Sequence, residues 1–487
     1  MKRNLLKVAA FLFAAVVSVG AMAQTVNLQT PVKEAADAYP QNGNYQLVNQ
    51  WIRSASAGNY KRADIAGGND LVRGMVAKDG KMYFCYRGGV GANSIIVVDA
   101  ISGDYVKTIK LSDNAFAAES VNAETGEVTM VNSVTLPNND IKLDSEGNFL
   151  VGPCITSGSQ PMQVYKVDIE TGECTELINE VLVNNPDFAA LSIRFDAFGV
   201  WGDVEDYAVV MAMNANAMNC FRWVIEDGVA GAAELVTLDP LFVGDASENP
   251  GSAPQIMPIS EDLFYLDGNA TFPTLYQYAD GKGSRVDCFY DETGASLPIL
   301  GTMNQGHNGI TDFQLKNADG ELEYFMCCAA TNTAKDPKSS FAIVKYADEA
   351  MSFQTAELIY QFPAKGFGSE SNGYRTAPAF AAPNAANEDA MDIFVYVGEN
   401  GFGRYTFSAD GKEIKQDQDV EDGELDHVAV ENVTIANVYT EGGLVVAEGE
   451  FEIFTVTGQN VTAQNGKLAQ GAYIVKAAGA TAKVVVK

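Results

Sequence analysis

A turn that occurs twice at long separation constrains the fold of this chain more than any other feature. Residues 97–104 have the sequence VVDAISGD, and residues 166–173 have the sequence KVDIETGE. In both segments a strand ends in Val-Asp, and a Ser-Gly or Thr-Gly pair precedes the return strand. Self-similarity at such a period is typical of repeat architectures.

Short apolar runs separated by glycine-containing turns fill the middle of the chain, and long amphipathic helical periods are hard to find. Asp-Gly pairs such as Asp79-Gly80 supply the positive φ angles that tight hairpins require. Six units of this kind can be recognised, at residues 72–111, 140–178, 193–228, 255–281, 311–360 and 377–415. Radial repetition of four-stranded units is typical of a β-propeller. We therefore predict an all-β fold with a six- or seven-bladed β-propeller over residues 24–416.

The strand expected at residues 45–52 precedes the first unit, and it has two possible places. It closes the ring against the last blade, or it belongs to a seventh, incomplete blade.

The first 23 residues predict a signal peptide. Lys2, Arg3 and Lys7 precede an apolar run over residues 8–19, and Ala21-Met22-Ala23 provides an Ala-x-Ala cleavage site. The apolar run is shorter than the roughly 20 residues that a membrane-crossing helix needs. We expect export to the periplasm, the cell surface or the medium, with no membrane-spanning segment in the mature chain.

Charge and cysteine content exclude some classes of partner and site. The formal net charge is −31, which disfavours a nucleic-acid partner because such binding depends on Lys and Arg neutralising phosphates. The seven cysteines contain no C-x-x-C pair of the kind that binds metals. A chain of this length buries a full core without a disulfide framework. We expect a monomer whose cysteines are mostly structural.

The pattern changes near the C-terminus, after an acidic segment at residues 417–427 that we interpret as a linker. Residues 428–487 contain Thr457-Gly458-Gln459 and then a Leu-x-x-Gly-x-Tyr-x-Val run at 468–475. These motifs resemble the C-terminal sorting domain of the type IX secretion system. The resemblance implies a small β-sandwich and the secretion machinery as a partner. The Tyr-Pro-Asn-Pro opening of that family is absent from residues 438–442, so a plain accessory sandwich stays an alternative.

The propeller hairpins have a local resemblance of their own. Residues 144–151, DSEGNFLV, and the Val-Asp-x-x-Ser/Thr-Gly turns are similar to bacterial extracellular propellers related to the NHL and lactonohydrolase groups. Lactonohydrolase-type propellers hold a metal with Glu, Asn and Asp side chains, and Asn139, Asp140, Asn308 and Asp312 are of those types. The same residue types are common in turns, so we predict no metal and no cofactor. The resemblance implies no function.

Candidate binding residues follow from position in the repeat, because the start of the first strand of each unit is expected to face the central channel. They are Arg73, Asp140, Arg194, Gln255, His307, Asn308 and Arg375. The planar donor forks of the three arginines suit an anionic or hydroxyl-rich ligand. The alternative is that these arginines form internal ion pairs with Asp70, Asp140 or Asp196.

No motif fixes a reaction. Gly-x-Ser-x-Gly and the Asp-x-Asp-x-Asp-Gly calcium loop are absent, and the only histidines, His307 and His427, exclude a His-rich zinc site. The sequence therefore favours an exported binding propeller that recognises a glycan or protein ligand. The alternative is a propeller hydrolase or lyase that acts on carbohydrate or lactone.

Overall fold

The computed structural model shows an all-β chain. It describes residues 44–54, 71–244, 249–268, 271–301, 309–330, 340–363, 366–367, 379–385, 387–397, 401–414, 439–441, 444–446, 451–455, 460–468, 471–477 and 480–486. The helices among these residues are short 3₁₀ turns at Leu182–Asn184, Pro298–Gly301, Phe353–Thr355 and Thr462–Gln464. The chain divides into two compact units, Met1–Asp419 and Val420–Lys487.

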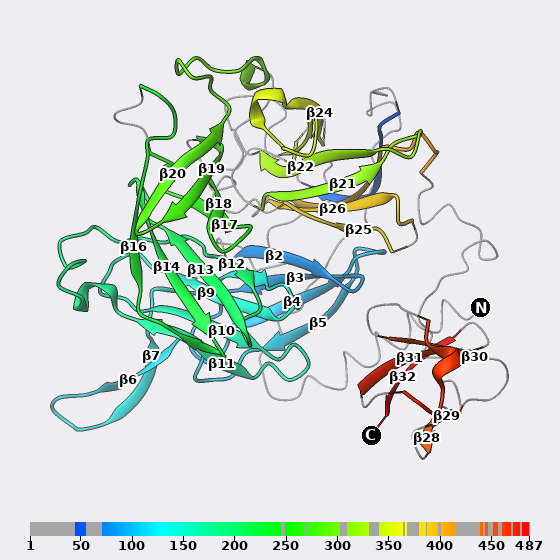
Figure 1. Ribbon diagram of the computed structural model, residues 1–487. Coiled ribbons are helices and arrows are strands. Elements are labelled where there is room, and N and C mark those ends of the chain that lie inside the picture. The colour runs from blue at the N-terminus through cyan, green and yellow to red at the C-terminus, as the bar shows by residue number, and fades with distance from the viewer. Residues whose placement is uncertain are drawn as a thin grey trace. The chain divides into compact units, whose positions relative to one another are not determined.

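Four separate four-stranded antiparallel sheets make up much of the first unit (Figure 1). Three of them are meanders, in which neighbouring strands follow one another in the chain. The first contains β2 (Val72–Lys78), β3 (Lys81–Tyr86), β4 (Ser94–Asp99) and β5 (Tyr105–Lys110), and the second contains β8 (Leu136–Leu143), β9 (Phe149–Cys154), β10 (Met162–Val167) and β11 (Cys174–Glu180). The third contains β21 (Thr311–Lys316), β22 (Leu322–Ala330), β23 (Ser340–Tyr346) and β24 (Glu357–Phe362). This architecture is a propeller.

The remaining part of the propeller is one nine-stranded sheet that joins two meanders. The first contains β12 (Gly199–Gly202), β13 (Tyr207–Met213), β14 (Asn219–Glu226) and β16 (Glu234–Leu238), with β15 (Val229–Ala230) paired to β14. The second contains β17 (Pro254–Pro258), β18 (Leu263–Gly268), β19 (Thr271–Ala279) and β20 (Lys282–Cys288). The two meanders are joined by a short parallel contact, in which Thr237 and Leu238 pair with Lys282 and Gly283.

The fourth separate sheet is built from both ends of the first unit. Its strand order is β1 (Gln46–Ser54), β27 (Gly401–Ser408), β26 (Ala390–Val397) and β25 (Ala379–Pro383). β1 pairs antiparallel with β27 along its whole length, from Gln46 opposite Ser408 to Ser54 opposite Gly401. β1, the strand that precedes the first unit, therefore closes the ring against the last sheet. This confirms the first of the two predicted places for it, and it does not belong to a separate incomplete blade.

The repeated turns have the geometry that their sequences predict. Asp79-Gly80 has φ angles of 50° and 70°, and both Asp227-Gly228 and Asp280-Gly281 are similar. In the long-period repeat, the Asp99 carboxylate accepts hydrogen bonds from the N–H groups of Ile101 and Ser102. Asp168 does the same with Glu170 and Thr171. The repeated form of the turn thus comes from an aspartate whose side chain accepts hydrogen bonds from nearby backbone N–H groups.

The first strands of successive sheets lie against one another. β2 packs on β8, β8 on β12, β12 on β17, β21 on β25, and β25 on β2. Glycine is required where two of these strands approach most closely: a Cβ on Gly74 would lie 2.7 Å from the Ile141 N atom. A Cβ on Gly199 would lie 2.2 Å from the carbonyl oxygen of Ile256. These contacts place the first strands together at the centre of the propeller.

The hydrophobic core consists of layers between neighbouring sheets. Residues of β2–β4 pack against β26, β27 and β1, and residues of β17–β19 pack against β21–β24. The side chain of Trp51 is fully buried in one such layer, where its Nε1 donates to the Ala100 carbonyl at 2.8 Å. Its ring also packs against Gly103 and edge-on against Phe402. Trp51 therefore connects the closing strand to the first repeated turn.

Three predicted strands differ from the structure. Ile193–Phe195 forms only an isolated bridge between Phe195 and Ile155, and β12 begins at Gly199 instead. The reason is a contact with a later segment of the chain: the Asn214 side chain accepts from the Arg194 N–H and donates to the Ser192 carbonyl.

The other two differences concern the second and last units. β8 begins at Leu136, so Asp140 lies inside this strand and not at its start. Residues 413–414 are not in a strand, because β1 occupies the outer edge of the last sheet.

Two further parts lie outside the four-stranded pattern. A two-stranded hairpin, β6 (Ala117–Val121) and β7 (Val128–Asn132), is inserted between β5 and β8. The second unit contains a two-stranded sheet of β28 (Tyr439–Glu441) and β29 (Leu444–Val446) and a three-stranded sheet of β30 (Phe451–Thr455), β31 (Gly471–Ala477) and β32 (Ala480–Val486). The predicted linker at 417–427 lies outside the described residues.

Replacing the buried tryptophan of the closing strand tests its importance for stability. We expect Trp51→Ala to lower the free energy of unfolding by about 3–5 kcal/mol, because it empties a fully buried ring site and leaves the Ala100 carbonyl without its donor. Urea denaturation measures the loss. Val229→Ala, at a residue that is 70% exposed, serves as the control and should change stability by less than about 0.5 kcal/mol. Equal stability of the two variants would contradict the role given to Trp51.

Candidate functional site

The structure describes four of the seven predicted site residues. Arg73 lies near the start of β2, and Gln255 is buried near the start of β17. Asp140 lies within β8, and Arg194 precedes β12, so the prediction that these two residues begin inner strands is wrong. His307, Asn308 and Arg375 lie outside the described residues, as does Asp70, one of the expected ion-pair partners.

Arg194 belongs to a polar group that we call the Asp196 cluster: Arg87, Asn139, Cys154, Arg194 and Asp196. The Arg87 guanidinium donates to the Asn139 side-chain oxygen at 3.0 Å, and the Asn139 amide donates to the Asp196 carbonyl at 2.6 Å. The Asp196 carboxylate accepts from Arg194 at 3.0 Å and from the Cys154 thiol at 2.9 Å. The segment that follows β3, the strands β8 and β9, and the segment that precedes β12 therefore contribute to one hydrogen-bonded group.

The electrostatics of this cluster follow from burial and from the balance of charges. Burial, and then the negative charge of Asp196, raises the pKa of the Cys154 thiol, while the positive charges of Arg194 and Arg87 oppose the rise. The thiol therefore stays protonated and acts as a donor, not as a nucleophile. Asp196 and Arg87 are buried, whereas the Arg194 side chain keeps 35% of its surface exposed. Arg194 is thus the cationic member of the cluster that solvent reaches.

Asp140 has a structural environment of its own. Its carboxylate accepts from the Lys142 ammonium at 2.9 Å and from the backbone N–H of Phe198 at 3.2 Å. The second bond links β8 to the segment that leads into β12. Asp140 is almost completely buried, so the carboxylate serves to join two neighbouring sheets.

A second polar group lies where the β17–β20 meander packs against the β21–β24 sheet. We call it the Asp312 cluster: Gln255, Tyr265, Asp267, Asp312 and Tyr346. The Tyr265 hydroxyl donates to the Asp312 carboxylate at 2.5 Å across this boundary. Asp267 lies directly opposite Gln255 in the β17–β18 register. The negative charge of Asp312 contributes to the raised pKa of Tyr346, after burial.

The two carboxyl groups of this cluster are held in an apolar layer. Burial raises the pKa of Asp312 to about 6, against a partly opposing effect of the Tyr265 hydrogen bond. Burial also holds the pKa of Asp267 well above its usual range. Within the part of the chain that the structure describes, Oδ1 of Asp312 and Oδ2 of Asp267 are buried without a hydrogen-bond partner. A carboxyl group with such a pKa can donate or accept a proton near neutral pH.

Several members of both clusters were not predicted from the sequence, among them Arg87, Cys154, Tyr265 and Asp267. They lie in or next to second strands of the sheets, at β3, β9 and β18, whereas the prediction considered first strands alone. One sequence signal could have identified such residues, namely a polar residue directly after an apolar run. Arg87 follows the apolar strand β3 in this way, and Asp267 follows Leu266. Asp196 was foreseen as an ion-pair partner, and it does pair with Arg194.

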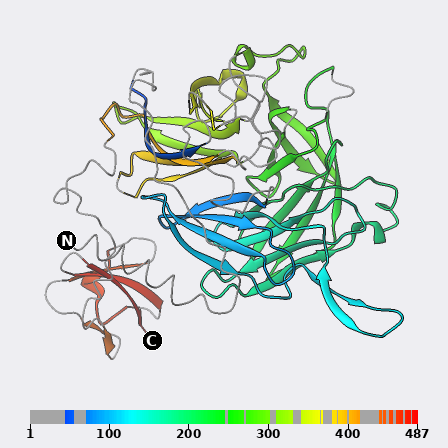
Figure 2. The same ribbon diagram turned by 180° about the vertical axis from the view of Figure 1, so that it is seen from behind.

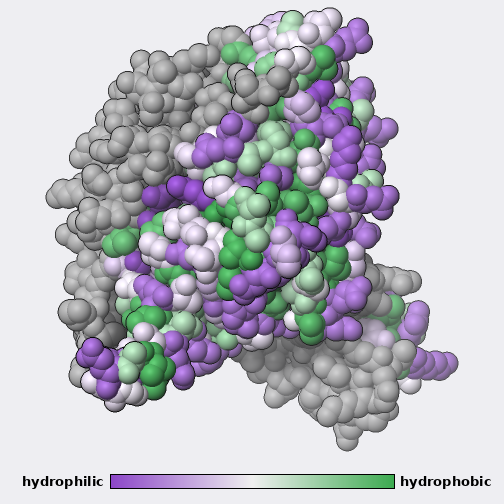
Figure 3. All heavy atoms as spheres, turned by 90° about the vertical axis from the view of Figure 1, so that its left-hand side faces the viewer, coloured by the Kyte–Doolittle hydropathy of each residue, from purple (hydrophilic) through white to green (hydrophobic). Residues whose placement is uncertain are grey.

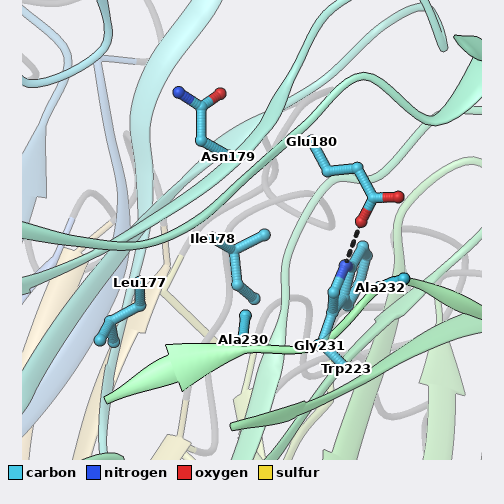
Figure 4. A pocket seen from close by; sticks show the side chains of 8 residues that line it. All are labelled: Leu177, Ile178, Asn179, Glu180, Trp223, Ala230, Gly231 and Ala232. Carbon is cyan, nitrogen blue, oxygen red and sulfur yellow. Dashed lines mark hydrogen bonds between the residues drawn. The ribbon is translucent and has the colours of Figure 1, made fainter.

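A pocket of about 280 Å³ lies away from both clusters, between the outermost strand β11 and the β14–β15 hairpin (Figure 4). It is lined by Leu177, Ile178, Asn179, Glu180, Trp223, Ala230, Gly231 and Ala232. One oxygen of Glu180 accepts from Trp223 Nε1 at 2.9 Å and from the Ala233 N–H at 3.1 Å. The pocket contains none of the predicted site residues.

The described residues show no metal site and no membrane-spanning helix. No group of three or more His, Cys, Asp and Glu side chains is arranged to hold a metal ion, and no described helix is long and apolar enough to cross a bilayer. All seven cysteines are free thiols. On the face shown in Figure 3, hydrophobic residues lie in small groups among hydrophilic ones.

The raised pKa of Asp312 predicts how stability depends on pH. The folded state binds this proton more tightly than the unfolded state, whose carboxyl has a pKa near 3.8. The resulting stabilisation is complete below about pH 4 and is lost as the pH rises through about 6. One pKa unit corresponds to about 1.4 kcal/mol, so the loss reaches about 3 kcal/mol. Asp267 has a shift of the same sign and adds to it.

Asp312→Asn removes this titration, so its free energy of unfolding should vary less between pH 4 and pH 7 than that of the parent chain. Urea denaturation at several pH values measures the difference. Asp280→Asn is the matched control, because Asp280 occupies an exposed turn with a φ of 48°, where asparagine is tolerated. A pH dependence that is identical in the parent chain and Asp312→Asn would refute the assignment.

Comparisons with known proteins found a family model and solved structures that are similar to this chain. Residues 100–250 match a family model described as a domain of unknown function, DUF8500, which covers under a third of the chain. No curated protein matches. A crystal structure of a DUF4623 family protein from Bacteroides eggerthii is 12% identical, with a TM-score of 0.45 over 78% of this chain and 77% of that one.

Two further solved structures are of proteins that are named for carbohydrate chemistry. The Trypanosoma rangeli sialidase in complex with sialic acid is 10% identical, with a TM-score of 0.35 over 93% of this chain and 72% of that one. The periplasmic gluconolactonase of Pseudomonas aeruginosa is 11% identical, with a TM-score of 0.33 over 79% and 99%. The solved structures to which this chain is similar thus include those of a sialidase and a gluconolactonase.

Proposed function

We propose that this protein is a non-catalytic binding propeller whose ligand is a glycan or protein that presents carboxylate groups to the Asp196 cluster. The observation that carries the proposal is that Arg87, which follows β3, and Arg194, which precedes β12, reach the same buried group of side chains. Within the cluster, Arg194 binds the Asp196 carboxylate and Arg87 binds the Asn139 side chain.

The chemistry of the cluster suits recognition better than reaction. An arginine fork binds a carboxylate through two parallel hydrogen bonds, and such charge-assisted bonds are stronger than neutral ones. The side chains that hold Arg194 and Asn139 in place are buried and hydrogen-bonded, so little conformational entropy is lost when a ligand binds. The protonated Cys154 adds no nucleophile.

Removing the solvent-accessible guanidinium tests the proposal. We expect Arg194→Gln to weaken binding of a polygalacturonate oligomer about tenfold or more, because a hydrogen bond to a charged group contributes about 1.5–3 kcal/mol. Isothermal titration calorimetry measures the affinity, with a neutral oligosaccharide of the same length as the comparison ligand. Arg285→Gln is the matched control, since Arg285 lies on the outer strand β20.

Three outcomes of this experiment would overturn the proposal. The first is unchanged affinity in Arg194→Gln, and the second is an equal loss in Arg285→Gln. The third is equal affinity of the parent chain for the neutral oligosaccharide. Thermal melting of both variants shows whether a loss of binding reflects unfolding.

We infer six blades for the propeller. The nine-stranded sheet consists of two four-stranded meanders that share only a two-residue parallel contact, so each is counted as one blade. Together with the four separate sheets, this assignment gives four strands to every blade. β1 completes the last blade, and among the described strands of the first unit only β6, β7 and β15 lie outside these blades.

We also propose that the chain is exported and that residues 428–487 form a sorting-like β-sandwich, joined to the propeller by the acidic linker at 417–427. Support comes from the signal-peptide pattern of residues 1–23 and from the two small sheets of the second unit around Val445, Ile453 and Val475. The protein is expected to act as a monomer at the cell surface, in the periplasm or in the medium. N-terminal sequencing of the exported protein should begin at Gln24, and a start at Met1 would contradict export by cleavage.

One observation favours the alternative, a propeller hydrolase or lyase that acts on carbohydrate or lactone. Asp312 has a pKa near 6 and a tyrosine donor, as a general acid would. Turnover of a polysaccharide or lactone panel that is abolished in Asp312→Asn and retained in Arg194→Gln would establish this alternative and end the binding-only proposal.

A further inference from the structure

The hairpin of β6 and β7, residues 117–132, extends away from the propeller sheets in both views of the chain (Figures 1 and 2). We call it the acidic ribbon. Each of its strands pairs only with the other, so the ribbon is a separate two-stranded sheet. Its base is fixed: Phe116 is fully buried, its ring packs edge-on against Tyr165, and its carbonyl accepts from the Ser133 N–H at 2.9 Å.

Apolar side chains of the ribbon are exposed to an extent that is unusual for a strand. Val121 is 61% exposed, Val128 is 55% exposed, Met130 is 47% exposed and Val131 is 42% exposed. The register places Val121 opposite Val128 and Glu119 opposite Met130, so three of these apolar side chains lie on one face. An isolated two-stranded hairpin is marginally stable in water and gains stability from a third strand.

The charge of the ribbon limits what can cover it. Glu119, Glu124 and Glu127 are its ionisable residues, and no Lys or Arg occurs between residues 117 and 132. A second copy of this chain would bring an identical negative ribbon and a net charge of −31. Like charges that are placed opposite one another on paired strands are destabilising. The complementary occupant therefore carries positive charge.

The backbone of the ribbon defines how such a partner would bind. In an antiparallel pair, alternate residues direct their N–H and C=O groups away from the partner strand. Both long edges of the acidic ribbon therefore present unpaired backbone groups, which are a template for another strand. Main-chain hydrogen bonds would supply affinity, and alternate side chains would supply specificity.

We propose that the acidic ribbon binds, by addition of a β-strand, an extended segment of a partner protein in which apolar residues alternate with Lys or Arg. The apolar residues of the segment cover Val121, Val128 and Met130. Its cationic residues lie near Glu119, Glu124 and Glu127. This interaction surface does not depend on the Asp196 cluster, so the two proposals can fail separately.

The experiment uses the full chain and two synthetic peptides of equal length, one of alternating Lys and Val and one of alternating Glu and Val. We expect the Lys-Val peptide to bind and the Glu-Val peptide not to bind, as measured by fluorescence anisotropy at low ionic strength. Hydrogen exchange should show new protection of the amides of residues 117–132 when the Lys-Val peptide is present, because the added strand pairs with a ribbon edge.

Charge reversal on the ribbon gives the decisive variant. Glu119→Lys combined with Glu124→Lys and Glu127→Lys keeps the apolar residues and the register. It should weaken binding of the Lys-Val peptide about tenfold or more and allow the Glu-Val peptide to bind, because electrostatic complementarity sets the choice of partner. Glu146→Lys combined with Glu173→Lys and Glu226→Lys, at positions outside the ribbon, is the control and should keep the parent preference.

Four outcomes would overturn the proposal. The first is equal binding of the two peptides to the parent chain. The second is binding without protection of residues 117–132. The third is a dimer in sedimentation analysis that the ribbon variant abolishes, which would identify a second copy as the occupant. The fourth is ribbon-dependent binding to phosphatidylglycerol vesicles, which would identify a membrane surface instead.

Discussion

The antiparallel pairing of β1 with β27 is the contact on which the rest of the propeller depends. It joins residues 46–54 to residues 401–408 and thereby completes a sheet whose other three strands come from the end of the first unit. Trp51 ties this sheet to the turn at Ala100 and Gly103 in the β2–β5 sheet. Without the closure, the two ends of the series of sheets would each expose an apolar face that is now buried.

Closure also explains where the polar groups gather. Sheets that pack face to face bury their apolar residues between neighbours, and the first strands meet one another along their edges at the centre. Polar side chains that are buried between neighbouring sheets must find partners in other segments of the chain, because burial without a hydrogen bond is costly. Hydrogen bonds join the residues of the Asp196 cluster to one another, and in the Asp312 cluster one such bond joins Tyr265 to Asp312. We propose recognition as the role of the first cluster, and proton exchange belongs to the alternative proposal for the second.

The acidic ribbon follows a different principle. Its residues do not contribute to any layer between sheets, and its strands have no third neighbour. Exposed apolar residues beside three glutamates do not evidently add to the stability of the propeller itself. Their arrangement is understandable if the ribbon pairs with another chain, which is why we propose for it an interaction separate from the ligand binding that we propose for the Asp196 cluster.

Much of the architecture was predictable because it depends on local chemistry. The Asp-Gly pairs at 79–80, 227–228 and 280–281 adopt the positive φ angles of tight hairpins, and Asp99 and Asp168 cap equivalent turns. The errors arose where a tertiary contact competed with a local preference. Ile193–Phe195 reads as a strand, yet Asn214 binds its backbone and β12 begins later.

The candidate site was less predictable, because it is formed by residues that are distant in the chain. Arg194 was selected for the wrong reason, as the start of a strand, although its pairing with Asp196 had been considered. Arg87, Tyr265 and Asp267 were not selected. Their environments depend on which sheets become neighbours, and no local pattern encodes that.

The sequence by itself determined the repeat, the all-β class, the tight turns and the acidic character of the chain, since each follows from the residues within one hairpin or from composition. Only the tertiary structure decided that β1 closes the last sheet, that Arg87 and Arg194 meet around Asp196, and that Tyr265 faces Asp312. The physical reason is that hairpin geometry is set by backbone preferences a few residues apart, whereas a buried polar cluster is set by packing between sheets.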